Sequence, residues 1–320
     1  MSAMQAPLRT PPLNRRLQAD LSLAFCAFLW GATYVSIKGA LASASVFVFL
    51  FLRCSLAAIA VALIYRITIR SLDRRSLSAG AVLGVLMFTS YALQTTGLRL
   101  TTPSKAAFIT GSSVVMVPLL HAWIGRHRVG LWAWTGALVS FAGIYFLTVP
   151  AAGIRGLNKG DLWMLACAVF LALHIIAVGH YTPRHPVGVL SFAQVGMTAV
   201  LGAVFLPLLW ITHLEAPRLV LSRVLVIGVL VAALGATAIG YSLQVWAQRF
   251  AAPAHVAILF SLRPIFAALT SYTVLGEHLT HRAIGGGALV LTGVLVSELM
   301  DREPAAGAPS GAAQPLPSAD

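Results

Sequence analysis

The segments 91–107, YALQTTGLRLTTPSKAA, and 241–257, YSLQVWAQRFAAPAHVA, carry the same residues at six matching positions, 150 residues apart. The same register continues to Gly136 and Gly143, which recur as Gly286 and Gly293. Because both copies are almost wholly apolar, the repeated unit is one that lies in a membrane. Duplicated membrane halves that enclose a site at the bilayer midplane are typical of transporters. The matching positions of the first copy are Tyr91, Leu93, Gln94, Arg99, Pro103 and Ala107.

The composition excludes a soluble fold. Hydrophobic residues make up 58% of the 320 residues and charged residues 10%, whereas soluble domains are about 25% charged. The mean hydropathy is +0.86, and apolar runs of about 20 residues match the thickness of a hydrocarbon core. Lipid offers no partner to backbone N–H and C=O groups, and the alternation of a membrane barrel is absent, so each run must be helical. The predicted fold class is an all-α integral membrane protein.

We predict ten transmembrane helices, five in each copy of the repeat. The first helices of the two halves also correspond, at a spacing of 141 residues. Five is an odd number, so the second copy must enter the membrane from the opposite side, and the two five-helix repeats are inverted. The repeats are assigned to 19–149 and 160–300, between disordered tails at 1–18 and 301–320. The predicted helices are 20–41, 45–66, 78–98, 104–124, 130–149, 160–180, 187–212, 223–248, 254–276 and 282–300.

Lysine and arginine are distributed unequally between the two sets of loops. If the N-terminus is cytoplasmic, the inside segments hold 12 of these residues and the outside segments hold 7. Positive residues favour the cytoplasmic side, and an even number of helices returns the chain to the side where it began. The sequence therefore predicts a multi-pass protein of the bacterial inner (plasma) membrane with both termini in the cytoplasm.

Other function classes are disfavoured by the distribution of charged and metal-binding residues. The net charge of +13 comes mainly from residues between the apolar runs, which fits membrane topology and predicts no nucleic-acid partner. Cys26, Cys54 and Cys167 all fall inside apolar runs, where small apolar packing explains them better than metal binding. The sequence holds no Cys/His cluster with metal spacing and no glycine-rich phosphate loop. We therefore predict that the protein is not an enzyme and carries no metal or cofactor.

A series of short motifs runs along both halves of the chain in a fixed order. They are Leu29-Trp30-Gly31-Ala32, Lys38, Arg53, Ala57, Lys105-Ala106-Ala107-Phe108, Pro118, Leu262-Arg263-Pro264, Gly276-Glu277, Gly286 and Gly293. With these motifs the chain, between Asp20 and about Met300, resembles the EamA type of the drug/metabolite transporter superfamily. The resemblance implies ten helices, a central cavity between inverted halves, and movement of small metabolites by alternating access.

Three residues of the first helix indicate a binding surface. Trp30, Tyr34 and Lys38 lie at i, i+4 and i+8, so they share one face. An aromatic pair beside a cation could hold a small zwitterion or a carboxylate, which predicts a substrate-binding role for all three. In the alternative, Trp30 packs on a neighbouring helix and Lys38 reaches the outer membrane interface.

Arginine occurs within two of the predicted helices. Arg263 lies near the middle of the ninth, beside Pro264, whose ring leaves the Phe260 carbonyl without its usual donor. A charge at the midplane is costly unless it meets water or a partner, so we predict that Arg263 faces the cavity and binds substrate. The resemblance implies a structural role for Arg53 in the second helix. Pro118 and Pro264 are also assigned structural roles.

Matching polar side chains occur in the third and eighth helices. Gln94 and Gln244 correspond in the repeat, and each follows a tyrosine, Tyr91 or Tyr241, by three positions. Two amides and two phenols related by pseudo-symmetry could orient a substrate, and hydrogen bonds between helices are the alternative. His174 in the sixth helix is a further substrate-binding candidate, with a packed, hydrogen-bonded side chain as its alternative.

No carboxylate is expected at mid-membrane, because all nine acidic residues lie at predicted helix ends, in loops or in the tails. Buried cations without a buried anion favour a neutral, zwitterionic or anionic substrate. The predicted function is a secondary transporter, an exporter of small metabolites such as amino acids that works by alternating access. A transporter of phosphorylated or nucleotide-linked sugars is the alternative, and a polytopic membrane enzyme is disfavoured. The predicted partners are a small-molecule substrate and the lipid bilayer, and a homodimer stays open.

Overall fold

The computed structural model describes residues 13–66, 72–101, 103–125, 129–149, 158–213, 215–275 and 280–300. Within these ranges all regular structure is helical, and extended backbone pairs only in an isolated bridge between Ala44 and Leu219. The helices are α1 (Leu13–Ala40), α2 (Val46–Ile64), α3 (Arg74–Leu100), α4 (Pro103–Gly111), α5 (Ser113–Gly125), α6 (Leu131–Thr148), α7 (Lys159–Tyr181), α8 (Val187–Ile211), α9 (Arg223–Leu230), the π-helix η2 (Val231–Ile239), α10 (Gly240–Ala247), α11 (Pro253–Phe260), α12 (Arg263–Leu275) and α13 (His281–Met300).

Eight helices or series of helices are long and apolar enough to cross a membrane. Two shorter apolar helices, Leu131–Leu147 and His281–Ser297, lie within α6 and α13. The prediction of an all-α membrane protein is therefore confirmed for the described residues. The count of ten crossings stays a prediction.

Two of the predicted helices are interrupted, each at the same position of the repeat. The breaks fall between α4 and α5 and between α11 and α12. At each break a serine hydroxyl, that of Ser112 or Ser261, donates at 2.6 Å to the backbone carbonyl three residues earlier. Such bonds compete with the helical ladder, and Pro264 has no N–H with which to continue it. The predictions of continuous helices over 104–124 and 254–276 are therefore wrong at these points.

The predicted helix 223–248 also departs from regular α-helical geometry. Its middle third is η2, in which Thr237 Oγ1 donates to the Ala232 carbonyl at 2.8 Å. π-Helical segments are rare and frequently mark functional sites. The irregular part of this helix faces the centre of the bundle, where Ala232 and Thr237 are fully buried.

The chain becomes helical earlier than predicted. α1 begins at Leu13, so residues 13–18, which the sequence assigns to a disordered tail, are helical. The segment from Leu13 to Ala19 contains no proline or glycine and is rich in good helix formers, which explains the early start. The rest of the predicted tails, 1–12 and 301–320, lies outside the described residues.

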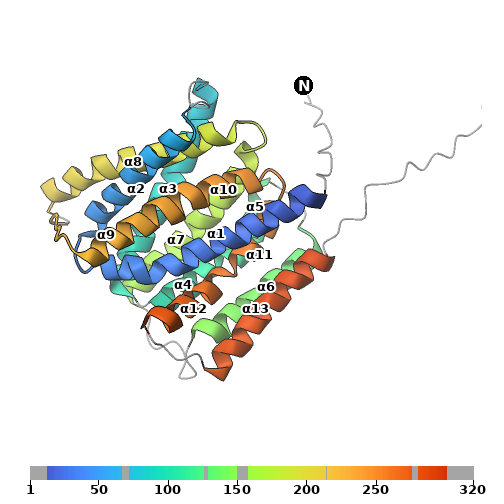
Figure 1. Cartoon of the computed structure of the whole chain (residues 1–320). Helices are drawn as coiled ribbons and strands as arrows, with labels where there is room; N and C mark the ends of the chain where they lie inside the picture. The colour runs from blue at the N-terminus through green and yellow to red at the C-terminus, as the bar shows by residue number, and fades with distance from the viewer. Residues whose placement is uncertain are drawn as a thin grey trace, which may run out of the picture.

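α6 and α13 pack along one another with glycine backbones in contact (Figure 1). A Cβ atom added at Gly136 would lie 2.7 Å from the Gly293 carbonyl oxygen, and one at Gly143 would lie 2.7 Å from that of Gly286. Because the residue number falls in α13 as it rises in α6, the two helices are antiparallel. Each glycine faces the repeat counterpart of the other, which is the contact pattern that a two-fold axis generates. This is the arrangement expected of inverted halves.

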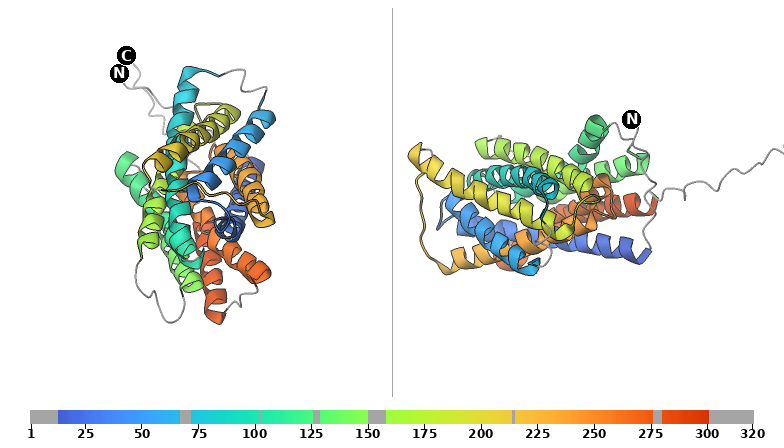
Figure 2. Two further views of the ribbon diagram at one scale, coloured as in Figure 1. Left: turned by 90° about the vertical axis from the view of Figure 1, so that its left-hand side faces the viewer. Right: turned by 90° about the horizontal axis from the view of Figure 1, so that it is seen from above.

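The two halves interlock around α1 and its counterpart α7. α1 packs against α9, η2, α10 and α12 of the second half, while α7 packs against α3, α4 and α5 of the first. α2 and α8 cover one side of the bundle, and the pair of α6 and α13 covers the opposite side (Figures 1 and 2). α1 begins and α13 finishes at one end, here named the terminal end, and α1 finishes at the other, the distal end (Figure 1).

Candidate functional site

A central cavity lies between the interlocked halves. It leaves about 30 Å³ for the centres of water-sized spheres, which is room for about two water molecules. Of the nine predicted substrate-binding residues, all except Lys38 line this cavity, and their role in binding stays a prediction. The lining residues are Trp30, Thr33, Tyr34, Ile37, Arg53, Ser90, Tyr91, Gln94, Leu171, His174, Ile175, Tyr241, Gln244, Phe260 and Arg263.

An aromatic row joins the two halves along the cavity. The Tyr91 and Tyr241 rings, which correspond in the repeat, have their centroids 5.8 Å apart and meet at 84°. The Trp30 ring follows at 5.0 Å from Tyr241. Trp30 Nε1 donates to the Ala236 carbonyl of η2 at 2.8 Å, which holds α1 against the irregular helix. The aromatic row is therefore built from α1, α3 and α10.

Arg263 begins α12 and turns its side chain back across the interruption of the helix. Its Nε donates at 3.1 Å to the Phe260 carbonyl, which Pro264 leaves without a helical donor. Its Nη2 donates at 3.2 Å to Ser113 Oγ, and Ser113 is its own counterpart in the first half. The side chain is 6% exposed, and its guanidinium lies 5.8 Å from the centroid of the Trp30 ring. One arginine thus ties both helix interruptions together at the wall of the cavity.

Arg53 projects from α2 into the same cavity. It is 2% exposed, and its Nε donates to Thr237 Oγ1 at 2.9 Å. Its guanidinium lies 3.8 Å from the centroid of the Tyr91 ring, a stacking that suits arginine, and its Nη1 has no hydrogen-bond partner among the described residues. The structural role predicted for Arg53 is therefore incomplete, because a buried cation with an unused donor lines the cavity. Pro118, by contrast, lies inside α5 and outside the lining.

The two matched glutamines are held by different partners. Gln94 Nε2 donates to the Tyr34 hydroxyl at 3.2 Å. Gln244 Nε2 donates to Gln248 Oε1 at 2.8 Å, and Gln248 Nε2 donates in turn to the Ile175 carbonyl at 2.9 Å. Because a backbone carbonyl can only accept, this series fixes the orientation of both amides. Gln244 Oε1 is left without a donor in the part of the chain that the structure describes.

His174 lines the cavity from α7, and its Nε2 lies 3.1 Å from Gln194 Oε1 of α8. The sequence analysis did not identify Gln194 or Thr33 as candidates. A signal for both was present, because at the spacing of 141 residues Gln194 is the counterpart of Arg53, and His174 is the counterpart of Thr33. Extending that register into the second helix of each half would have found this second polar pair.

Lys38 lies outside the cavity, which corrects the prediction that it belongs to the binding surface. Its Nζ donates to the carbonyls of Leu98, Arg99 and Thr101 at 2.7, 3.2 and 3.0 Å. The last carbonyls of a helix have no intrahelical donor, so the ammonium group caps the end of α3. Eight residues rise about 12 Å along a helix, and this distance carries Lys38 from the level of the cavity to the distal end.

Lys38→Met should lower stability without changing substrate affinity. The substitution leaves the last carbonyls of α3 without a charged donor, so we expect the free energy of unfolding to fall by about 1–3 kcal/mol. The melting temperature should fall accordingly, while the half-saturating substrate concentration stays at the wild-type value. A rise of about tenfold in that concentration, at an unchanged melting temperature, would return Lys38 to the binding surface.

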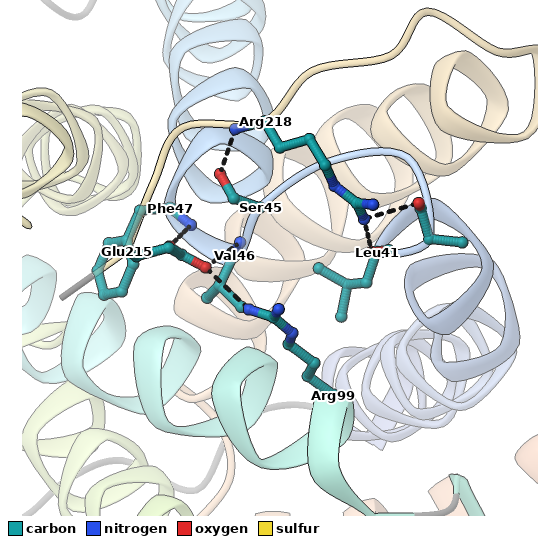
Figure 3. Close-up of polar contacts among 8 residues, drawn as sticks. Leu41, Ser45, Val46, Phe47, Arg99, Glu215 and Arg218 are labelled. Atoms are coloured by element: carbon teal, nitrogen blue, oxygen red, sulfur yellow. Dashed lines mark hydrogen bonds and ion pairs between the residues drawn. The ribbon is translucent and has the colours of Figure 1, made fainter. Parts of the chain in front are cut away.

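The connection between α8 and α9 closes the distal end of the bundle (Figure 3). The Glu215 carboxylate accepts from the N–H groups of Val46 and Phe47 at 2.9 and 3.1 Å and so caps the beginning of α2. The same carboxylate pairs with Arg99 Nη1 at 3.2 Å. Arg218 of this connection donates from Nη2 to two backbone carbonyls that follow α1, at 3.3 and 2.7 Å. The connection between α1 and α2 is thereby fastened to both halves.

The terminal end is held by the repeat counterpart of Arg99. Arg249 Nε donates to the Thr182 carbonyl at 3.1 Å, in the connection between α7 and α8. Thr182 Oγ1 donates in turn to the Val245 carbonyl at 2.6 Å. Burial lowers the pKa of the Arg249 guanidinium, but arginine stays cationic at neutral pH. Matched arginines thus hold matched connections at opposite ends, Arg99 through Glu215 and Arg249 directly.

The acidic residues nearest to these helices do not reach the cavity. Asp20 Oδ1 lies 2.9 Å from His255 Nε2, between α1 and α11. Its counterpart Asp161 accepts a hydrogen bond from Thr101 Oγ1 at 2.6 Å. Neither carboxylate belongs to the cavity lining. Within the described ranges, no three His, Cys, Asp or Glu side chains lie close enough together to hold a metal ion.

Comparison with known proteins gives a family match over most of the chain. The EamA-like transporter family matches residues 17–149 and 158–299, which nearly coincide with the two predicted repeats. An uncharacterized transporter of Archaeoglobus fulgidus is 32% identical over 285 residues, which cover 89% of this chain and 87% of that protein. An uncharacterized transporter of Synechocystis sp. is 25% identical over 192 residues, which cover 53% and 58%.

A solved crystal structure shares the fold. The two chains superpose with a TM-score of 0.71 at 19% sequence identity, and the match covers 89% of this chain and 97% of the other. At that identity the likeness concerns the fold alone.

Proposed function

Because the chain belongs to the EamA-like transporter family, we propose that its central cavity is the substrate site of a secondary transporter that works by alternating access. Family membership and the names of the two relatives point to a membrane transporter rather than an enzyme. One observation carries the proposal for the site: a buried polar cavity is lined by matched residues of two inverted halves. Transporters with inverted repeats bind substrate at such an interface.

In this proposal the chain crosses a bacterial inner membrane ten times. α6 and α13 are the two shorter crossings, and a helix that is somewhat short is accommodated by local thinning of the bilayer. The terminal end faces the cytoplasm, in keeping with the excess of lysine and arginine there. Both termini then lie on the cytoplasmic side.

The matched connections at the two ends act as gates. Arg99 and Glu215 hold the distal end, and Arg249 holds the terminal end. With both ends held, the cavity has room for only about two water molecules, so it must widen to accept a metabolite. During transport one set of contacts breaks while the other holds. The pseudo-symmetry of the halves makes either end equally able to open.

Small polar metabolites such as amino acids fit the chemistry of the lining, and we propose export as the direction of transport. Guanidinium, amide and phenol groups bind carboxylates and polar substituents through charge-assisted hydrogen bonds. Phosphorylated or nucleotide-linked sugars are the second candidate, because Arg53 and Arg263 would pair with phosphate as readily as with carboxylate.

A transport screen in proteoliposomes tests the proposal. The purified protein is reconstituted, and uptake and efflux of free amino acids, sugar phosphates and nucleotide sugars are measured with and without a pH gradient. We expect at least one of these classes to cross the membrane with saturable kinetics and to exchange faster when unlabelled compound is present on the other side. Rates equal to those of protein-free liposomes for every compound would contradict the proposed function.

A further inference from the structure

The cavity gathers positive charge that no described acidic side chain balances. Arg53 and Arg263 are 2% and 6% exposed, and both line the cavity. No aspartate or glutamate is among the described residues of its lining. A buried cation is stable when it is paired and its donors are satisfied, and Arg53 Nη1 is not satisfied by any described residue. The site is therefore complementary to an anion.

The two guanidinium groups lie at opposite ends of the aromatic row. Arg53 stacks on Tyr91 at 3.8 Å, and Arg263 lies 5.8 Å from the Trp30 ring. Tyr241 stands between these two rings, at 5.8 and 5.0 Å from them. Aromatic faces on which the cations rest keep both guanidinium groups in place and leave their edges to form hydrogen bonds.

Gln244 supplies an acceptor that complements these donors. The side chain is 1% exposed, and Gln248 fixes its amide so that Oε1 is the atom without a partner among the described residues. Leaving a buried acceptor unpaired is unfavourable, so a donor group of a ligand would bind here with advantage. The cavity thus presents an unused donor on Arg53 and an unused acceptor on Gln244.

We propose, resting on the proposed function above, that the substrate is a small organic anion. Its carboxylate or phosphate oxygens bind Arg53 Nη1, and an N–H or O–H group of the same molecule donates to Gln244 Oε1. Arg53 is then a specificity-determining residue as well as a packing element. Cationic compounds are rejected, because the cavity would place them beside two guanidinium groups.

The test compares each acid with a derivative that lacks the anionic group. Wild-type protein in proteoliposomes is offered free amino acids beside the corresponding amino-acid amides, and sugar phosphates beside the parent sugars. We expect the anionic member of the transported pair to be preferred by about 100-fold, and the pair that responds distinguishes carboxylate from phosphate. Equal transport of both members would overturn this inference and leave the proposed function standing. Transport of no compound would instead contradict the proposed function.

Variants of Arg53 locate the preference. Arg53→Gln should abolish the preference for the anion, whereas Arg53→Lys, which keeps the charge, should retain part of it. A purely structural role would slow all compounds alike and lower the melting temperature, without changing the ratio between acid and amide. A wild-type ratio in Arg53→Gln would overturn the role of Arg53.

Gln244→Met is the second variant, and it decides the question if Arg53→Gln does not accumulate in the membrane. It removes the acceptor and leaves both guanidinium groups. We expect weaker transport of an amino acid but not of the same acid without its amino group. An unchanged preference between these two acids would contradict the assignment of Gln244 Oε1.

Discussion

Arg263→Ala, present in the membrane at the wild-type level, is expected to move no substrate. The truncation removes a guanidinium group from the cavity wall and breaks the bonds to Phe260 O and Ser113 Oγ that join the two helix interruptions. Removing one partner of a buried, charged hydrogen bond costs about 2–5 kcal/mol, which lowers affinity by about 30-fold or more. The loss of the tie between the interruptions adds to this, because the cavity wall is no longer fixed.

Two further variants separate charge from folding. Arg263→Lys keeps the charge but not the two-point bonding and should transport slowly. Arg16→Ala removes an exposed arginine at the terminal end and should transport like the wild type. Initial rates in proteoliposomes are measured together with melting temperatures, so that a folding defect is recognised. A wild-type rate in Arg263→Ala would exclude this residue from the site.

Gly286→Ala is expected to prevent close packing of the two halves. The added Cβ would lie 2.4 Å from Leu147 N and 2.7 Å from Gly143 O, and these backbone atoms cannot rotate away. α6 and α13 would have to separate. Overpacking costs about 1–3 kcal/mol in general, and a contact with backbone belongs at the upper end of that range or beyond it. We expect less folded protein in the membrane and a melting temperature several degrees lower.

Gly287→Ala is the matched control on the same helix. A Cβ atom added there meets nothing within 4 Å. The variant should match the wild type or exceed its melting temperature slightly, because alanine favours a helix over glycine by about 1 kcal/mol. Equal melting temperatures for Gly286→Ala and Gly287→Ala would contradict the close antiparallel contact of α6 and α13.

The repeated spacing of 150 residues was enough to predict the all-helical architecture and much of the cavity. It related Gly136 and Gly143 to the glycines that they later meet in crossed pairs, and it matched Tyr91 with Tyr241. The helix interruptions were not predictable in the same way. A serine that bonds back within a continuous helix has the same sequence signature as one that ends it. The outcome depends here on Arg263, which reaches across the break.

The candidate site was predicted better in its membership than in the roles of its cations. Helical spacing placed Lys38 on the face of Trp30, but it contains no information about the α3 carbonyls that the ammonium group caps. Arg53 was assigned to the scaffold because one role satisfied the sequence. A guanidinium group has five donor hydrogens, and only the packed structure shows that one nitrogen of Arg53 has no described partner.

The claim at the centre of this account is that the cavity opens to each side of the membrane in turn. Ser90 lines the cavity and is 1% exposed, so Ser90→Cys places a small reactive group there. The substitution is made in a chain whose buried cysteines, Cys26, Cys54 and Cys167, are replaced by alanine. Labelling by a membrane-impermeant thiol reagent is then measured in right-side-out and inside-out vesicles. Labelling from both sides, slowed in both cases by a transported compound, is the predicted result; labelling from neither side, or from one side only, would contradict the account.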